Sequence, residues 1–461
     1  MKNIINRALA AEKKLFTLLL AVAASVGTMF AAPVRIGDLY YNLDATNQTA
    51  EVVRQNASGE IIIPSSVTYN SVSYSVTSIG EKAFFNCTGL TSVTIGNSVT
   101  SIGDVAFDYC TGLTSLTIGN SVISIGEGAF AYCTGLTSVT IPNSVTSIGG
   151  SAFYWCNGLT SVTIGNSVTS IGEGAFSYCS GLTSIEIPNS VTYIESGAFA
   201  VCFSLTSIDV ASDNSNYCSV DGVLFNKDKT ILIQYPGGKQ GSYTIPNSVT
   251  SIVEWAFAGS RVLTSIDVAS DNSNYCSVDG VLFNKDKTTL IQYPGGKQGS
   301  YTIPNSVTSI GNQAFYWCTG LTSVTIPNSV TSIGNNAFYI CISLTSIEIP
   351  NSVTSIGNEA FAWCSGLTSV TNFANTPQEI DSYVFDNVDK STCVLYVPAG
   401  SISDYQSADG WKDFTKILPI SQQGLEDVQG NNLQCIKVVH NGQLFILREG
   451  RIFNANGIQV R

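Results

Sequence analysis

The chain repeats a motif every 23 residues, and this period constrains its fold more strongly than any single residue does. A period of this length is typical of a solenoid, in which each unit buries its apolar face only against its neighbours. We therefore expect an extended binding surface and not a deep pocket. The period is marked by two series, Phe84, Phe107, Phe130, Phe153, Phe176 and Phe199, and Cys87, Cys110, Cys133, Cys156, Cys179 and Cys202.

The apolar positions inside one unit predict two short strands and a tight segment. Val93 and Ile95 alternate with polar residues, as the inward positions of a strand do. Val99 and Ile102 mark a second extended segment, and Gly103 then breaks the chain. The following stretch, with the pattern xxAFxxC, suits one helical or 3₁₀ turn. Parallel strands from successive units would form a sheet with outward rows of Thr and Ser.

The repeat consensus LxxVxIPxxVxxIGxxAFxxCxxL resembles the BspA-type leucine-rich repeat, which is also described from treponemal surface proteins. The resemblance covers about residues 75–411, with Ser98 or an equivalent at the turn position where most leucine-rich repeats have Asn. It implies a β-rich α/β solenoid, a curved horseshoe of 23-residue coils displayed outside a bacterial cell. It also implies adhesion to host proteins or to other bacteria.

The regular spacing breaks at two long units near 205–262 and 263–320, because Phe199, Phe257 and Phe315 are 58 residues apart. The extra residues read as a β-meander with a hairpin turn at Asp221. Such insertions are plausible binding loops projecting from the stack. A calcium site is the alternative for their aspartates, but the spacing fits no calcium loop, and turn residues are the preferred reading. The aspartates are Asp209, Asp213, Asp221 and Asp228.

The ends of the chain differ from the repeats. Residues 1–32 have the basic, apolar and small-residue regions of a signal peptide. Residues 33–78 are expected to cap the first coil, and 79–370 form the leucine-rich repeats. We expect a C-terminal cap at 371–420, in which aromatic residues cover the last coil. Those residues are Tyr405, Trp411 and Phe414.

Residues 421–461 read as a polar linker and a short β-rich tail. The tail resembles the sorting domain of type IX secretion clients. Together with the leader, this resemblance implies a protein that is secreted or attached to the bacterial outer surface. No later segment is long and apolar enough to span a membrane, so we expect no membrane span in the mature chain.

Charge and cysteine content narrow the possible partners. The net charge of −12 and the pI of about 4.5 leave no basic surface for nucleic acid. Of the 13 cysteines, nine occupy one repeat position, where Ser260 stands in another unit. A position that accepts Ser beside a buried aromatic favours free, packed thiols, although neighbouring coils are close enough for disulfides.

Nothing in the repeats supports catalysis. The only histidine, His440, lies in the C-terminal tail, and the abundant Ser and Thr have no base aligned with them. No CxxC pair suggests a zinc site. We therefore predict a non-enzymatic protein with no catalytic, cofactor-binding or metal-binding residues and no cofactor.

Two surfaces compete as the binding site. The first is the strand face, expected to be concave: Thr91, Ser92, Thr94, Thr137, Ser138, Thr140, Glu186, Asp209, Asp267 and Glu348. The second is an aromatic stripe immediately before the repeat cysteine: Tyr109, Tyr132, Trp155, Tyr178, Trp317 and Trp363. Exposed rings would suit a sugar or a protein, but packing between coils is the preferred reading of the stripe.

Three function classes follow. An adhesin or protein-binding scaffold, with an extracellular protein or host-surface ligand, comes first. A glycan-binding surface protein comes second and needs the aromatic stripe exposed in a row. A structural or ice-binding scaffold comes third and needs a flat sheet.

Overall fold

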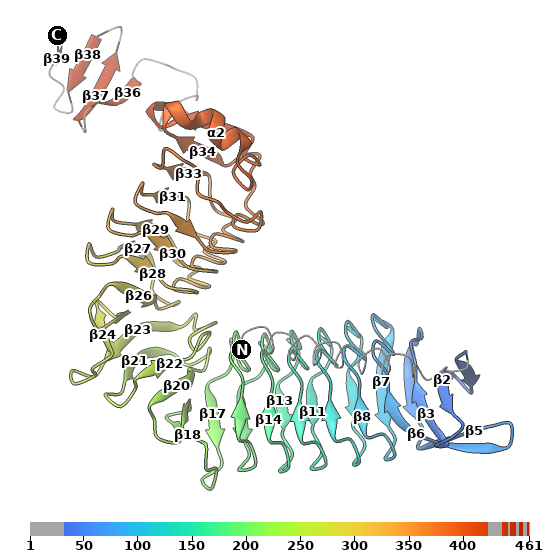
Figure 1. Ribbon diagram of the computed structural model, residues 1–461. Helices are drawn as coiled ribbons and strands as arrows, with labels where there is room; N and C mark the ends of the chain where they lie inside the picture. The colour runs from blue at the N-terminus through green and yellow to red at the C-terminus, as the bar shows by residue number, and fades with distance from the viewer. Residues whose placement is uncertain (1–31, 423–435, 441–442, 449–450, 455–458, 461) are drawn as a thin grey trace, which may run out of the picture.

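The computed structural model describes residues 32–422 and four strands of the C-terminal tail, at 436–440, 443–448, 451–454 and 459–460. Its coils stack into two arms that meet at a bend (Figure 1). All of the expected signal peptide except its last residue lies outside the described residues. In the part of the chain that is described, no helix has the length and apolar character needed to cross a membrane.

Each regular coil contributes one strand to each of two parallel rows. Equivalent residues pair in register, as Ser92 does with Ser115 and Ile102 with Ile125. The first row is β7 (Leu90–Ile95), β9 (Ser115–Thr117), β11 (Ser138–Thr140), β13 (Ser161–Thr163), β15 (Ser184–Ile187), β17 (Ser207–Val210), β21 (Gly241–Ile245), β23 (Leu263–Val268), β27 (Gly299–Thr302), β29 (Leu321–Thr325), β31 (Ser346–Ile349) and β33 (Ser369–Asn372).

The second row contains mostly two-residue strands. They are β8 (Ser101–Ile102), β10 (Ser124–Ile125), β12 (Ser147–Ile148), β14 (Ser170–Ile171), β16 (Tyr193–Ile194), β20 (Ile231–Gln234), β22 (Ser251–Ile252), β26 (Thr289–Gln292), β28 (Ser309–Ile310), β30 (Ser332–Ile333) and β32 (Ser355–Ile356). The chain therefore folds into a β-solenoid with coils of roughly 23 residues.

The third side of the coil consists of separate turns and is not the continuous helical or 3₁₀ turn that was expected. We call the stretch with the pattern xxAFxxC, such as residues 104–110, the AF segment. It is a series of tight turns, and two of its positions adopt left-handed backbone, as Val105 (φ 49°) and Tyr109 (φ 60°) do. Inter-coil hydrogen bonds hold this backbone: the N–H of Val105 donates to the carbonyl of Glu127 at 2.7 Å, and that of Tyr109 to Ala131 at 2.9 Å. Such φ values are unfavourable for non-glycine residues, so this ladder is what maintains them.

The interior repeats as regularly as the sequence. The repeat phenylalanines stack from Phe84 to Phe199 with ring centroids 4.9 to 5.8 Å apart. The buried thiol of Cys156 donates to the carbonyl of Phe130 at 3.1 Å. Ser98 takes over the role of the turn Asn, because its hydroxyl donates to the carbonyl of Val76 at 2.7 Å. All twelve described cysteines are free, as predicted for the nine at the repeat position.

The long units contain a complete coil and are not simple insertions. In the first, β18 (Tyr217–Val220) and β19 (Val223–Asn226) form a hairpin, and β20 then takes a place in the second row beside β22. The hairpin does not project freely, since Val223, Leu224 and Phe225 are buried. The second unit repeats this arrangement with β24 (Tyr275–Val278), β25 (Val281–Asn284) and β26.

These coils are short on the AF side, and this shortness produces the bend. Tyr235 takes the phenylalanine position and stacks on Phe257 at 5.6 Å. The following Pro-Gly-Gly omits the outer turn, so the N–H of Val201 reaches past this coil to the carbonyl of Ala258 at 3.0 Å. The interior therefore contains three stacked coils where the AF side contains only two. Because the AF side is shorter, the stack bends toward it.

The close approach at the bend requires glycine. Gly259 has φ +84°, and a Cβ there would lie 2.6 Å from the Cα of Val201. The second long unit also contains a coil that is short on the AF side, in which Tyr293 stacks on Phe315 at 5.1 Å. These two short coils lie at the bend between the arms in Figure 1.

Strands that pair antiparallel, except that β3 (Thr49–Val52) and β6 (Val72–Ile79) are parallel, cover the first coil. The others are β1 (Val34–Ile36), β2 (Leu39–Asp44) and β5 (Ser66–Tyr69), while β4 (Gly59–Ile63) pairs with β7. At the other end, Trp411 and Phe414 pack on Phe385, the last ring of the stack, at 5.4 and 5.2 Å. The elements there are β34 (Val394–Val397), η1 (Ala399–Ser401), α2 (Ile402–Ser407), β35 (Lys416–Pro419) and η2 (Ile420–Gln422).

The described part of the tail is a four-stranded antiparallel sheet. Its strands are β36 (Ile436–His440), β37 (Gln443–Arg448), β38 (Arg451–Asn454) and β39 (Gln459–Val460).

Candidate functional site

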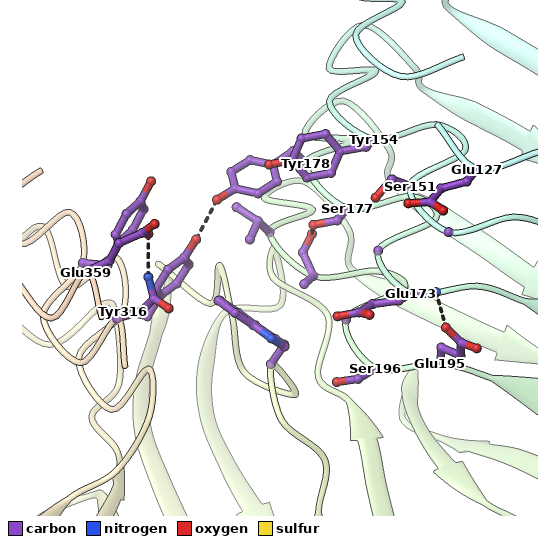
Figure 2. Close-up of a pocket in the computed structure, with 18 residues that line it drawn as sticks. Glu127, Ser151, Tyr154, Glu173, Ser177, Tyr178, Glu195, Ser196, Tyr316 and Glu359 are labelled. Atoms are coloured by element: carbon purple, nitrogen blue, oxygen red, sulfur yellow. Dashed lines mark hydrogen bonds between the residues drawn. The ribbon is translucent and has the colours of Figure 1, made fainter. Parts of the chain in front are cut away.

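A groove of about 670 Å³ lies on the inner side of the bend, between the two arms (Figure 2). We call it the bend groove. Its side chains come from the AF segments and not from either strand row, so the hollow of the molecule lies on a different side from the expected strand face. The lining side chains include Glu127, Ser151, Tyr154, Glu173, Ser177, Tyr178, Glu195, Ser196, Trp255, Tyr316, Asn336, Tyr339 and Glu359.

Almost every lining residue occupies one of four positions in the repeat, the two before and the two after Ala-Phe. Glu127 and Glu173 hold the first of these positions, Asn336 and Glu359 the second, and Tyr154 the third. These are the positions at which the units of this chain differ most from one another, while the flanking text is nearly constant. The variability of these positions was a signal in the sequence that could have pointed to them as binding residues. The sequence did not predict the bend that brings the positions together in one groove.

Aromatic rings cross the groove from one arm to the other. In the first arm, Tyr154 packs edge-on against Tyr178 at 5.3 Å. The hydroxyl oxygens of Tyr178 and Tyr316 are 2.6 Å apart and share a hydrogen bond. Tyr316 stacks on Tyr339 of the second arm at 5.1 Å, and Trp255 meets Tyr316 edge-on at 5.2 Å. The groove wall is therefore a connected series of rings, fixed by contacts on both sides of the bend.

Four carboxylates surround these rings. Glu127 and Glu173 are exposed on the first arm, whereas Glu195 and Glu359 are partly buried. Glu195 accepts a hydrogen bond from the backbone N–H of Glu173 at 2.9 Å, and Glu359 accepts one from the amide of Asn336 at 2.9 Å. No Lys, Arg or His lines the groove. Its surface is thus negative and aromatic.

The groove tyrosines are neutral phenols at physiological pH. Burial raises the pKa of Tyr154, Tyr178 and Tyr339 to about 12. Their hydroxyls can therefore both donate and accept hydrogen bonds. The negative charge of the groove comes from its carboxylates alone.

The aromatic stripe lies on the same side of the solenoid. Its first four members form a ladder: Tyr109 on Tyr132 at 4.2 Å, then Trp155 on Tyr178 at 4.3 Å. Only Tyr109 and Trp363, at opposite ends, are exposed, at 40 % and 44 %. Tyr178 belongs to the bend groove. Trp317 packs nearby against Phe203, whose ring also carries the Arg261 guanidinium at 3.7 Å.

The strand-face residues lie along the first row in both arms, and none of them lines the bend groove. The exposed ones are Thr91, Thr137, Ser138, Thr140, Glu186, Asp209 and Glu348, and the intermediate ones are Ser92, Thr94 and Asp267. Glu186 and Asp209 are register partners on β15 and β17.

Part of this row borders a second candidate groove. Thr140 and Glu186 line a groove of about 890 Å³ where the amide of Asn189 donates to Asp213 at 2.7 Å. Within the described residues, no cluster of three or more His, Cys, Asp or Glu side chains is arranged to hold a metal ion.

Comparisons with known proteins agree with this architecture. A family model described as BspA type Leucine rich repeat region matches residues 63–157, 100–227, 237–298 and 295–406. The chain is similar to the pneumococcal vaccine antigen PcpA, with TM-score 0.51 and 23 % identity, over 85 % of this chain and 99 % of that one. No curated protein matches it.

Two further solved structures are similar in sequence. A leucine-rich cell surface protein from Faecalibacterium prausnitzii is 29 % identical, over 86 % of this chain and 97 % of that one, with TM-score 0.48. A leucine-rich repeat protein from Bacteroides ovatus is 25 % identical, over 83 % and 98 %, with TM-score 0.39.

Proposed function

The chain belongs to the BspA-type leucine-rich repeat family, and on that premise we propose that it is an exported bacterial surface protein that binds an extracellular partner protein in the bend groove. Binding supports adhesion to a host surface or to a neighbouring cell. The solenoid acts as a rigid, non-enzymatic scaffold.

One observation carries the choice of the bend groove. The positions at which the repeats differ converge there, whereas the strand rows present nearly the same Thr and Ser in every coil. A specific partner needs a surface that differs from coil to coil, because a uniform surface offers many equivalent registers. Buried aromatic rings are also the side chains that most often dominate the energy of protein interfaces.

Export and surface location are part of the same proposal. They rest on the signal-peptide pattern of residues 1–32 and on the tail at 421–461, which resembles a type IX sorting domain. The similar protein from Faecalibacterium prausnitzii is a cell surface protein, which is consistent with that location.

Glycan binding is the second candidate function. Exposed Tyr109 and Trp363 offer ring faces to a sugar, and the groove carboxylates can accept hydrogen bonds from its hydroxyls. The strand face remains the alternative surface for a protein partner, through Glu186 and its neighbours. A structural or ice-binding scaffold is the least supported class, because the bend divides the strand rows into two arms.

The proposal is tested by surface plasmon resonance with the mature chain, against extracellular-matrix proteins and a glycan panel. Two glutamate variants distinguish the surfaces, Glu173→Gln in the bend groove and Glu186→Gln on the strand face. Both residues are exposed, so neither change should unfold the chain. The proposal predicts saturable binding to a matrix protein that Glu173→Gln weakens and Glu186→Gln does not. Binding to glycans alone would replace it with the second candidate.

A further inference from the structure

We propose that the bend groove receives a lysine- or arginine-bearing segment of the partner protein, in extended conformation, with cationic side chains spaced to meet carboxylates on neighbouring coils. This inference rests on the proposed function and specifies the chemistry of the partner.

Charge complementarity is the first step. The groove has four glutamates and no cationic residue, and the ion pairs among the described residues lie elsewhere. Glu195 and Glu359 are partly buried and accept hydrogen bonds only from a backbone N–H and an amide in the described structure. A cation supplied by a partner would be attracted to all four carboxylates at once.

The aromatic walls are the second step, because a cation is also attracted to the face of a tyrosine or tryptophan ring. The bend already shows this contact inside the chain: the guanidinium of Arg261 lies 3.7 Å from the Phe203 ring centroid and 5.7 Å from that of Trp317. In the groove, the ring of Tyr154 lies on the side of Glu127 and the ring of Tyr316 on the side of Glu359 (Figure 2). A neutral sugar would use the rings but leave the charge unbalanced.

The solenoid geometry sets the spacing of the cations. Glu127 and Glu173 occupy the same repeat position two coils apart, so their backbones are separated by about 10 Å, twice the usual distance between neighbouring strands. An extended peptide in the polyproline II conformation advances about 3.1 Å per residue and has three residues per turn. Basic residues three positions apart in such a segment therefore lie on the same side, about 9 Å apart, and match the two glutamates.

The coil between those glutamates leaves room for a side chain. Gly150 holds the equivalent position there, with an ordinary backbone conformation. A Cβ at Gly150 would come no closer than 3.4 Å to any atom, the nearest being the carbonyl oxygen of Glu173. A lysine at this position would therefore fit and would place a cation of the chain's own between Glu127 and Glu173.

The test uses fluorescence anisotropy with the full mature chain and three labelled probes. The first is a flexible peptide with lysines three residues apart, the second is the same peptide with glutamine at both sites, and the third is a neutral oligosaccharide. We expect saturable binding of the lysine peptide alone, weakened at least fivefold by Gly150→Lys and by the double variant Glu127→Gln/Glu173→Gln. Glu186→Gln on the strand face should leave it unchanged.

Equal binding of the glutamine peptide, preference for the oligosaccharide, or lysine-peptide binding unaffected by both groove variants would each overturn the inference. Thermal melting of each variant verifies folding, and the double variant serves if Gly150→Lys does not fold. Competition separates this inference from the proposed function. If a matrix protein needs the groove for binding but is not displaced by the lysine peptide, the inference of a cationic segment is wrong. The proposed function of the groove would then still hold. Matrix-protein binding that ignores the groove variants overturns the proposed function itself.

Discussion

The hydroxyl oxygens of Tyr178 and Tyr316 lie 2.6 Å apart although 138 residues separate them in the chain. Tyr178 belongs to the first arm and Tyr316 to the second, so this hydrogen bond closes the inner side of the bend. It lies on the wall of the bend groove, which links the shape of the solenoid directly to its candidate site.

Replacing Tyr178 by Phe should destabilise the bend. The Tyr316 side chain is only 5 % exposed, and its hydroxyl would lose its partner. Leaving such a group unsatisfied costs about 1–3 kcal/mol. Chemical denaturation measures this loss. The double variant Tyr178→Phe/Tyr316→Phe should recover part of it, and a double variant as unstable as the sum of the single changes would contradict the role of the pair.

The repeat thiols should resist modification until the chain unfolds. Cys156 is fully buried, its thiol donates to the Phe130 carbonyl, and burial raises its pKa to about 12. Because only the thiolate reacts readily, an aromatic disulfide reagent should label partly buried Cys218 and Cys276 first. Mass spectrometry identifies the labelled sites. Early labelling of Cys156 in the folded chain would refute this ordering.

The same thiols predict a loss of stability in alkali. The pKa of Cys156 is about 12 in the folded chain, above the ordinary value of 9.0, so the unfolded chain loses this proton first. Stability from such groups is complete below the ordinary pKa and falls as pH rises from 9 toward 12. Denaturation curves at pH 8 and pH 10 measure the effect, and Cys156→Ala should reduce the pH dependence. An unchanged dependence in that variant would contradict the assignment.

Asp108 should respond to pH in a different window. Its carboxyl is buried with one oxygen that lacks a hydrogen-bond partner in the described structure, and burial raises its pKa to about 6. A raised carboxyl pKa lowers stability as pH rises from about 4 to 6, because the folded chain must then hold a buried charge. Asp108→Asn should therefore stabilise the chain at pH 7 by about 1–2 kcal/mol and have little effect at pH 4. Equal effects at both pH values would exclude titration as the cause.

Removing the C-terminal cover should release the end of the stack. Trp411 is fully buried, packs on Phe385 and donates its indole N–H to the carbonyl of Gln378 at 2.9 Å. Trp411→Ala should cost about 3–5 kcal/mol, as truncation of a buried aromatic does. Hydrogen exchange should accelerate in the last coils and remain slow near Phe130, because repeats contact only their neighbours. Uniform acceleration would contradict this local effect.

Much of the coil could be predicted from the sequence, because the same side chain performs the same task in every unit. The stacked phenylalanines, the free thiols and the role of Ser98 all follow from positions that recur at a fixed period. The predicted helical or 3₁₀ turn was only partly right, because hydrogen bonds between residues three apart are present, as from the N–H of Asp108 to the carbonyl of Val105, but they form separate turns and no helix. The AF segment instead uses left-handed residues, held by hydrogen bonds to the next coil that one repeat alone does not reveal.

The bend groove could not be predicted, because it depends on a difference in length between neighbouring coils. Tyr235 preserves the interior stack while the residues after it omit the outer turn, and only the stacked structure shows that Val201 then meets Ala258. Glu173 and Glu359 line one groove for this reason alone. The strand-face residues, by contrast, follow the first strand row, where Glu186 and Asp209 are register partners.

The most direct test of the groove as the binding surface compares the affinities of two variants for the same matrix protein. Glu173→Gln changes the bend groove, and Glu186→Gln removes a matched exposed charge from the strand face. If the partner binds in the bend groove, the dissociation constant should be several-fold larger for Glu173→Gln and unchanged for Glu186→Gln. The reverse result, with binding lost only in Glu186→Gln, would contradict it and assign the partner to the strand face.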